Sequence, residues 1–313
     1  MARTKTTASA DTITADLVAV LVAVTEGEPR IMTIANASAL PSGPFEFAHR
    51  SLQTGLRAWV EAQTGHPLGY VEQLYTFADR GRSGDAKAHS ISISYLGLTR
   101  EDPVGQGFEA HWSGWYEYFP WEDHRAGPPL LLPKVLTPRL KAWAKSAPTT
   151  ALQRQRWQRV AITFGLDSRA WNEEMVLQRY ELLYEAALIA EAVRDNGKPA
   201  SIVPGRPMTA DHRRILATGI ARLRAKIKYR PVVFELMPAE FTLLQLQRCV
   251  EALAGRLVHK QNFRRLMEQQ ELVEETGAMT SDTVGRPAKL FRFRHAVQAE
   301  RAVAGTKLPL SRP

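Results

Sequence analysis

The sequence has few of the features that mark secreted or membrane proteins. Cys249 is the only cysteine among 313 residues, which excludes an intramolecular disulfide and a thiolate metal cluster. The most apolar early run, residues 17–24, is far shorter than the roughly 18 residues that a membrane-spanning helix needs. No leucine-rich leader precedes this run, so we expect a cytoplasmic protein with no membrane partner.

Two common ligand-binding signatures are also missing. The eight histidines include no pair at the spacing of a helical zinc site, so no transition-metal site is predicted. The glycine-containing turn at residues 81–84 lacks the Gly-Lys-Ser/Thr ending of a P-loop. Apolar residues make up 44% of the chain and charged residues 23%, which is typical of a folded globular protein with about two domains at this length.

Positive charge is concentrated in the last third of the chain. The whole sequence carries a net charge of +9, yet residues 1–205 hold 21 Lys and Arg against 22 Asp and Glu. Residues 206–301 hold 18 against 10. A basic region of this kind is typical of a protein that contacts a phosphate backbone, although an ordinary basic surface produces the same balance.

The first two thirds of the chain mix strands and helices. β-Branched residues at 16–24 and 30–34 flank a Glu-Gly-Glu-Pro turn, which predicts a hairpin. Helical spacing of apolar residues at 51–63, ended by Gly65, predicts a helix, and strands are expected at 70–77 and 88–98. Helices are expected at 171–193 and 210–227. The fold class is therefore α+β.

The C-terminal part has the pattern of a winged helix. A helix at residues 241–253 begins with a capping box at Thr242 and ends at Gly255, and a second helix covers 258–270. A turn at Gly277 and a basic strand ending near residue 294 would complete a hairpin. Cys249, inside the first helix, is expected to be a small core residue.

Such a unit reads duplex DNA with the start of its second helix and touches phosphates with its wing. The expected DNA contacts are Thr242, Lys260, Gln261, Asn262, Arg264, Arg265, Arg286, Pro287 and Lys289. Two alternatives remain open: a helical hairpin with a solvated charged face, and a winged helix that contacts protein.

Several separate motifs resemble the Nudix-related transcriptional regulators of NAD metabolism (NrtR-like). They occur in the family's order and cover about residues 15–295: GYVEQLYTF at 69–77, ADH at 210–212, ARLRAKIKY at 221–229, LMP at 236–238, NFRR at 262–265 and GRPA at 285–288. The residues at 59–65 and the aromatic run near 112–121 look more like those of the alphaproteobacterial regulators of NAD biosynthesis. The resemblance implies a Nudix-like α/β/α sandwich followed by a winged helix-turn-helix domain.

The implied organisation has five parts. Residues 1–14 would be a disordered N-terminus and 15–205 the effector-sensing Nudix-like domain. A connecting helix at 206–228 would lead to the DNA-binding domain at 229–301, followed by a tail at 302–313. The aromatic segment 111–121 is expected in a core or dimer interface, with stacking on an adenine ring as the alternative.

The Nudix box of the related hydrolases is eroded in this chain. With Gly43 as its first glycine, His49 occupies the position of the first required Glu and Ala58 that of the next, while Arg57 matches. Glu61 is the only acid in the rest of that helix. Mg²⁺ requires several oxygen ligands to act on a pyrophosphate. We therefore expect a pocket that binds without hydrolysis, and no required cofactor.

The resemblance implies an adenine-containing effector such as ATP, NAD(H) or ADP-ribose. Candidate effector contacts are Arg57, Glu61, Glu72, Tyr75, Arg80 and Arg82, since arginines on a glycine-containing turn can bond phosphate oxygens. The expected function is a homodimeric repressor that reads a palindromic operator of NAD biosynthesis or salvage genes. The alternatives are a Nudix hydrolase of ADP-ribose-like pyrophosphates with a DNA-binding appendage, and a nucleotide-sensing scaffold whose winged helix contacts protein.

Overall fold

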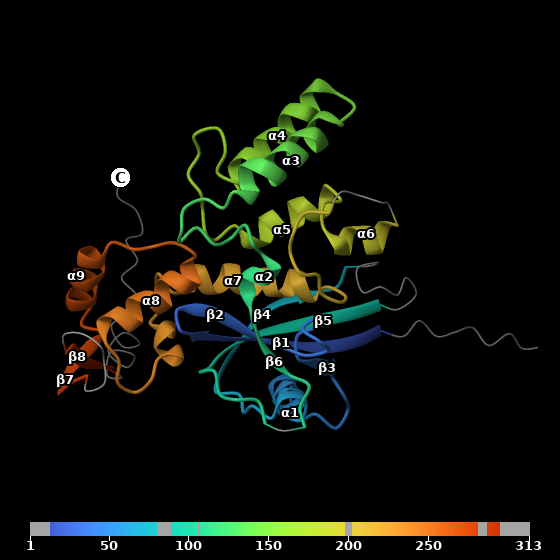
Figure 1. Ribbon diagram of the computed structural model, residues 1–313. Coiled ribbons are helices and arrows are strands. Elements are labelled where there is room, and N and C mark those ends of the chain that lie inside the picture. Colours follow the sequence, from blue (N-terminus) through green and yellow to red (C-terminus); the bar gives the residue numbers. More distant parts are fainter. Residues whose placement is uncertain (1–12, 80–88, 106, 198–201, 281–286, 295–313) are drawn as a thin grey trace, which may run out of the picture.

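The computed structural model describes residues 13–79, 89–105, 107–197, 202–280 and 287–294. At its centre lies a mixed six-stranded sheet with the order β4-β5-β1-β2-β6, in which β3 pairs with β1 (Figure 1). The strands β1 and β5 run parallel to each other. The pairs β1–β2, β1–β3, β2–β6 and β4–β5 are antiparallel. The bounds are β1 Ile13–Thr25, β2 Glu28–Thr33, β3 Ser42–Pro44, β4 Tyr70–Phe77, β5 His89–Leu98 and β6 His111–Gly114.

The predicted hairpin at the start of the chain is confirmed as β1 and β2. Glu26 and Gly27 form the turn with φ values of 53° and 76°. Positive φ at both central residues is the mark of a type I′ turn, whose twist matches that of the two strands.

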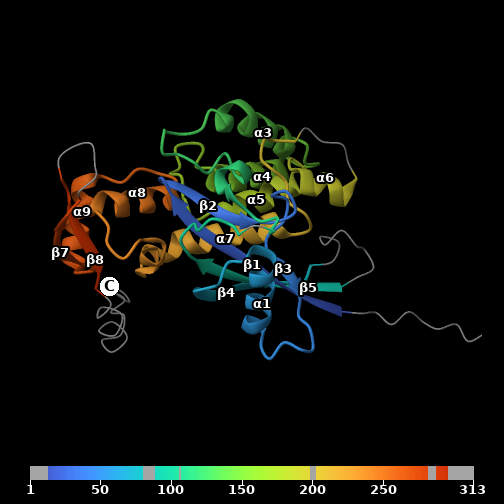
Figure 2. The same ribbon diagram turned by 60° about the horizontal axis from the view of Figure 1, so that its bottom comes forward.

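Side chains of β1 alternate between two cores. Val18, Val20 and Val22 belong to the core on one face of the sheet, while Leu17 and Leu21 belong to the core on the other face. Helix α1 (Leu52–Thr64) covers the second face and α7 (His212–Lys226) the first, as both views show (Figures 1 and 2). The expected α/β/α sandwich is confirmed.

Both ends of α1 follow from local chemistry. The Ser51 hydroxyl accepts a hydrogen bond from the Thr54 amide, and Gly65 ends the helix with a φ of 67°. A short polar side chain at the first position and a left-handed glycine after the last turn are the usual helix caps. The predicted helix and its stop at Gly65 are confirmed.

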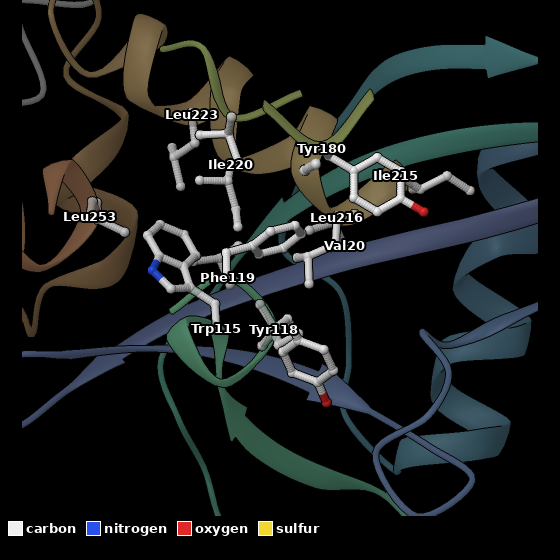
Figure 3. Close-up of a cluster of buried hydrophobic side chains, with 14 of the residues drawn as sticks. Val20, Trp115, Tyr118, Phe119, Tyr180, Ile215, Leu216, Ile220, Leu223 and Leu253 are labelled. Atoms are coloured by element: carbon white, nitrogen blue, oxygen red, sulfur yellow. The ribbon is translucent and has the colours of Figure 1, made fainter. Parts of the chain in front are cut away.

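The aromatic segment after β6 lies in the core. Trp115, Tyr118 and Phe119 on and after α2 (Trp115–Tyr118) are fully buried. Figure 3 shows Trp115 and Phe119 between Val20 of β1 and Ile220 of α7. Burial of each large apolar side chain contributes roughly 1.5–3 kcal/mol. The expectation of a core position is confirmed for these aromatics.

A further helical layer covers α7 on the side away from the sheet. It contains η1 (Leu132–Leu136), α3 (Thr137–Lys145), α4 (Thr150–Thr163), α5 (Val176–Glu185) and α6 (Ala190–Asn196). The prediction of one helix at 171–193 was wrong. Ala187 takes a left-handed φ of 55°, and the Leu188 amide bonds the Leu183 carbonyl, which ends α5 in a Schellman-type turn.

The C-terminal unit contains η2 (Val232–Leu236), α8 (Leu243–Ala254), α9 (Lys260–Gln270), β7 (Val273–Met279) and β8 (Lys289–Phe293). The capping box between Thr242 and Gln245 and the stop at Gly255 are confirmed. The turn expected at Gly277 was wrong. This glycine lies inside β7 with a φ of 81°, where the pairing with β8 shifts register between Glu275 and Met279.

A buried carboxylate joins the helical layer to α7. Glu122 accepts hydrogen bonds from Arg179 of α5 at 2.5 and 2.9 Å and from Arg224 of α7 at 2.7 Å. Arg224 also donates to the Leu253 carbonyl at the end of α8, at 2.8 Å. Burial alone would raise the pKa of Glu122, but the two guanidiniums outweigh it and the pKa falls below its usual range.

Gly255 completes this junction between the sheet domain and the winged helix. Its carbonyl accepts a hydrogen bond from the His124 amide at 2.7 Å, and a Cβ at this position would lie 2.4 Å from the Glu122 carbonyl oxygen. Tyr116 donates from its hydroxyl to the Ala252 carbonyl at 2.7 Å. Backbone groups of the last turn of α8 are therefore bound directly by the first two thirds of the chain.

We predict that Gly255→Ala destabilises the protein more than Gly197→Ala. Both glycines end helices with left-handed φ values, 68° and 62°, but an added Cβ at Gly197 meets no atom of the described residues within 4 Å. Both variants should lose roughly 1 kcal/mol from the backbone, and Gly255→Ala about 1–3 kcal/mol more from the clash at the junction. Urea unfolding followed by circular dichroism measures both losses. Equal losses would contradict a tightly packed junction.

None of the helices in the described ranges is long and apolar enough to cross a membrane.

Candidate nucleic-acid interface and ligand pocket

Helix α9 presents one buried and one exposed face. Phe263 is 7% exposed and packs in the main core, with Met267 partly buried beside it. Glu268, Gln269 and Gln270 are exposed in its last turn, and the exposed polar side chains of its first two turns are Lys260, Gln261, Asn262, Arg264 and Arg265. Their donors and acceptors are of the kind that base edges and phosphates bind.

The remaining expected DNA contacts have different surroundings. Thr242 is buried, and its hydroxyl is engaged with Gln245 at the start of α8. Pro287 is exposed, and Lys289 on β8 pairs with Glu275 at 2.9 Å. Arg286 lies outside the described residues. The structure thus brings five of the expected contacts together on α9.

Two of the expected effector residues lie on the α1 side of the sheet. The guanidinium of Arg57 donates to the carbonyls of Leu68 and Gly69, which ties the middle of α1 to the segment before β4. Glu61 is exposed on the same helix. In this structure Arg57 therefore holds the segment before β4 against α1.

Glu72 and Tyr75 lie on β4. The Glu72 carboxylate forms an ion pair with Lys226 of α7 and accepts a hydrogen bond from the Tyr70 hydroxyl at 2.8 Å. Tyr75 is 59% exposed, and its ring contacts that of Phe77 at 5.0 Å. Because Glu72 faces α7, the sheet separates it from Arg57 and Glu61. The expected Arg80 and Arg82 lie outside the described residues.

A polar cavity of about 390 Å³ opens at the first turn of α7. It is bounded by the first residues of β1 and β5, by β3, and by the end of β4: Thr14, Asp16, Val18, Ser42, Gly43, Phe77, Asp79, Ser90, Ser92, Ala210, Asp211 and His212. The Ser90 hydroxyl donates to the Asp16 carboxylate at 2.6 Å. Sequence reasoning missed this pocket, although its ADH segment was one of the motifs that carried the resemblance.

His212 is a neutral imidazole in this cavity wall. Its Nδ1 accepts a hydrogen bond from the Leu40 amide at 2.9 Å, which leaves the ring proton on Nε2. Burial lowers the pKa of His212 to about 4, against the opposing effect of the nearby Asp16. His212 is the first residue of α7, which agrees with the helix expected from residue 210.

Arg214, in the first turn of α7, pairs with acids at the rim of the cavity. Its guanidinium pairs with Asp79 at 2.5 Å and with Asp211 at 3.5 Å, and also with Glu181 of α5. The same group lies 4.7 Å above the Phe77 ring. The end of β4 is thereby fixed to α7.

A second cavity, of about 460 Å³, lies between the C-terminal end of α7 and the winged helix. Its walls are largely apolar and include Ile227 of α7, Leu246 of α8 and Leu266 of α9. Helix α7 therefore contributes its first turn to one cavity and its last turn to the other. Among the described residues, no three His, Cys, Asp or Glu side chains gather in a way that could hold a metal ion.

Comparison with known proteins identifies the C-terminal unit. Residues 233–293 match the family of NrtR DNA-binding winged helix domains. The expected resemblance to NrtR-like regulators is thereby confirmed. A curated relative, the ADPR responsive transcriptional repressor NtrR of Acinetobacter baylyi, is 42% identical over 84 residues. That match spans 26% of this chain and 33% of the relative, so it covers about a third of that protein's length.

Solved structures share the fold of nearly the whole chain. Shewanella oneidensis NrtR, crystallised with a 27mer DNA, superposes with a TM-score of 0.55 over 91% of this chain and 95% of its own, at 18% identity. A MutT/nudix family protein from Enterococcus faecalis gives a TM-score of 0.53 over 93% and 90%, at 15% identity. The fold is therefore that of a Nudix-like domain followed by a winged helix, as expected.

We predict that His212 makes the protein less stable in acid. The unfolded pKa of about 6.5 lies above the folded value of about 4, so the unfolded chain binds more protons as the pH falls through this window. The contribution of the neutral His212 to stability is fully present above pH 6.5 and is lost as the pH falls toward 4. Between about pH 7 and pH 4.5 the unfolding free energy should fall about 2 kcal/mol more than in His212→Asn, whose amide oxygen can still accept from Leu40. If the unfolding free energies of the wild type and His212→Asn, measured in urea, fall equally with pH, the prediction is contradicted.

Proposed function

We propose that this protein is a DNA-binding transcriptional regulator, acting in the cytoplasm, whose Nudix-like domain senses an adenine nucleotide. The observation that carries the proposal is the exposed polar face of α9 in a unit that matches the NrtR DNA-binding winged helix domain. Residues 15–205 form the sensing part, 206–228 the connection and 229–301 the DNA-reading part of this proposal. Repression rather than activation is adopted from the name of the curated relative.

In this proposal α9 enters the major groove with its first two turns. The His259 side chain makes no capping bond at the start of the helix, so the first backbone amides are left for phosphate oxygens. Lys260, Gln261, Asn262 and Arg264 contact bases, and Arg265 with the wing contacts the backbone. One winged helix reads few base pairs, so we propose a homodimer on a palindromic operator of NAD biosynthesis or salvage genes.

We propose the polar cavity at the first turn of α7 as the effector pocket. Its carboxylates and serine hydroxyls can accept hydrogen bonds from ribose hydroxyls and an adenine amino group. Tyr75 packs against Phe77 of the cavity wall, and Arg80 and Arg82 follow Asp79 in sequence as the candidates for the phosphates. Arg57, Glu61 and Glu72 are left out of the proposed contact set, because the first two lie beyond the sheet and the third is paired with Lys226.

ADP-ribose is the first effector to test, since the curated relative is described as ADPR responsive. ATP and NAD(H) share its adenine nucleotide and are the next. We propose that hydrolysis has been lost, because Glu61 is the only acid left in the part of the Nudix box that α1 carries. Turnover of ADP-ribose with Mg²⁺ that Glu61→Gln abolishes would establish a hydrolase instead.

The proposed signal passes along α7. Asp211 and His212 line the proposed effector cavity, whereas Arg224, about three turns later, binds the Leu253 carbonyl near the end of α8. An effector changes DNA binding only if it binds two arrangements of this helix unequally. The bond from Arg224 to α8 would carry a shift of α7 to the winged helix.

We predict that Arg264→Ala and Arg265→Ala each weaken DNA binding while nucleotide affinity stays at the wild-type level. Loss of a base contact should cost about 1–3 kcal/mol, or roughly 5- to 150-fold in Kd, and relax specificity at one position, whereas loss of a phosphate contact weakens all sequences alike. Fluorescence anisotropy on a duplex selected from a random pool measures the first effect, and calorimetry with ADP-ribose the second. Arg248→Ala, exposed on α8, is the matched control.

Equal loss of DNA and nucleotide binding in both variants would indicate misfolding and would remove their support for the proposal. If the Kd of the wild-type protein for DNA does not change with salt concentration, the scaffold alternative is favoured, in which the winged helix contacts protein.

A further inference from the structure

A helical hairpin formed by α3 and α4 carries an unusual concentration of positive charge. Residues 126–166 contain seven Lys and Arg and no Asp or Glu: Lys134, Arg139, Lys141, Lys145, Arg154, Arg156 and Arg159. The net charge of residues 1–205 does not show this cluster, because acids elsewhere in that range offset it. It lies far in sequence from the basic C-terminal region.

Most of the charge at the end of the hairpin is not neutralised by acids. Arg159 pairs with Glu185 at 2.6 Å. Lys145 and Arg154, near the loop between the two helices, and Lys134, in η1 before α3, are exposed and have no carboxylate partner in the described ranges. A polyanion bound along the hairpin would be attracted to these cations with no acid of residues 126–166 to oppose it.

Two tryptophans between the helices hold further cations. The guanidinium of Arg156 lies 4.6 Å from the Trp143 ring centre, and the Lys141 ammonium 5.9 Å from that of Trp157. Such cation–π contacts position a charged group without neutralising it. The charge of the hairpin is therefore both ordered and available.

The chemistry of the hairpin surface fits a phosphate backbone better than a protein. Protein interfaces are centred on buried apolar or aromatic anchors. On α3 and α4, which the structure describes in full, Ile162 near the end of α4 is the one large apolar side chain that is exposed. Phosphate-backbone binding needs only Lys and Arg in suitable number.

The hairpin also has a suitable place in the molecule. In both views it stands away from the sheet, on the side where α7, α8 and α9 lie and opposite α1 (Figures 1 and 2). In the described residues it is attached to the rest mainly through η1 and α5. In Figure 1 its outer end points away from the sheet and away from the winged helix at the left, so the hairpin and α9 would meet DNA at separate places.

We propose that the α3–α4 hairpin is a second DNA-binding surface, which contacts the phosphate backbone without reading sequence. The inference rests on the proposed function as a DNA-binding regulator and adds to it a backbone contact outside the winged helix. Each phosphate that the hairpin neutralises should release counterions and steepen the salt dependence of DNA binding.

The test compares two triple variants of the full chain. Lys134, Lys145 and Arg154 are changed to Gln in one, and Arg50, Arg100 and Arg222, which are also exposed, in the other. Binding to a fluorescein-labelled duplex of random sequence is measured by anisotropy between about 50 mM and 200 mM NaCl. The hairpin variant should lower the slope of log Kd against log salt by about 2 to 3, or about 0.9 per lost phosphate contact. The control should leave the slope unchanged.

Three results would overturn the inference. Slopes equal to wild type in both triple variants would show that the hairpin charges face no DNA, and equal decreases in both would show a general charge effect. A loss confined to single-stranded RNA would assign the surface to RNA instead. Arg264→Ala separates this inference from the proposed function, because it tests α9 alone. If Arg264→Ala weakens specific binding while the hairpin variant does not, only the hairpin inference fails. Unchanged thermal melting of the triple variants confirms that they fold.

Discussion

The structure depends on one buried carboxylate, Glu122, held between the guanidiniums of Arg179 and Arg224. All three side chains are excluded from solvent, with exposures of 1%, 0% and 0%. Removing such charges from water costs several kcal/mol each, and only a complete set of bonds offsets that cost. The carboxylate therefore fixes α5 and α7 in one arrangement, and it does so beside the end of α8.

The same arrangement explains why the winged helix is not an independent appendage. Arg224 donates from Nη1 to the Glu122 carboxylate and the Glu173 carbonyl, and from Nε to the Leu253 carbonyl. A movement of α7 that broke one of these bonds would leave a buried charge poorly compensated, which is strongly unfavourable. Small displacements of α7 are thus expected to carry α8, and with it α9, as one body.

Local chemistry predicted much of the fold. The β1–β2 turn, the stop of α1 at Gly65 and the capping box at Thr242 depend on residues within a few positions of one another, so the sequence was sufficient. The break at Ala187 was missed because alanine rarely adopts a left-handed φ and favours helix. Its conformation depends on the packing of α5 and α6, which no local pattern contains.

The candidate sites divide in the same way. The exposed face of α9 follows from helical spacing around Phe263. The cavity with Asp16 and His212 joins positions that are nearly two hundred residues apart in the chain, and the Glu72–Lys226 pair joins two motifs that were assigned separately. Only the closure of the sheet against α7 brings these residues together. Charge balance likewise failed to show the hairpin, because a sum over residues 1–205 averages across separate surfaces.

The central claim is that a nucleotide in the Nudix-like domain and DNA on the winged helix are coupled through α7. The most direct measurement is the Kd for a selected duplex with and without saturating ADP-ribose, together with the Kd for ADP-ribose with and without that duplex. The account predicts that both change by the same factor, about 5- to 150-fold, since coupling between two sites is reciprocal. Tight binding of each ligand with neither affinity altered by the other would contradict it.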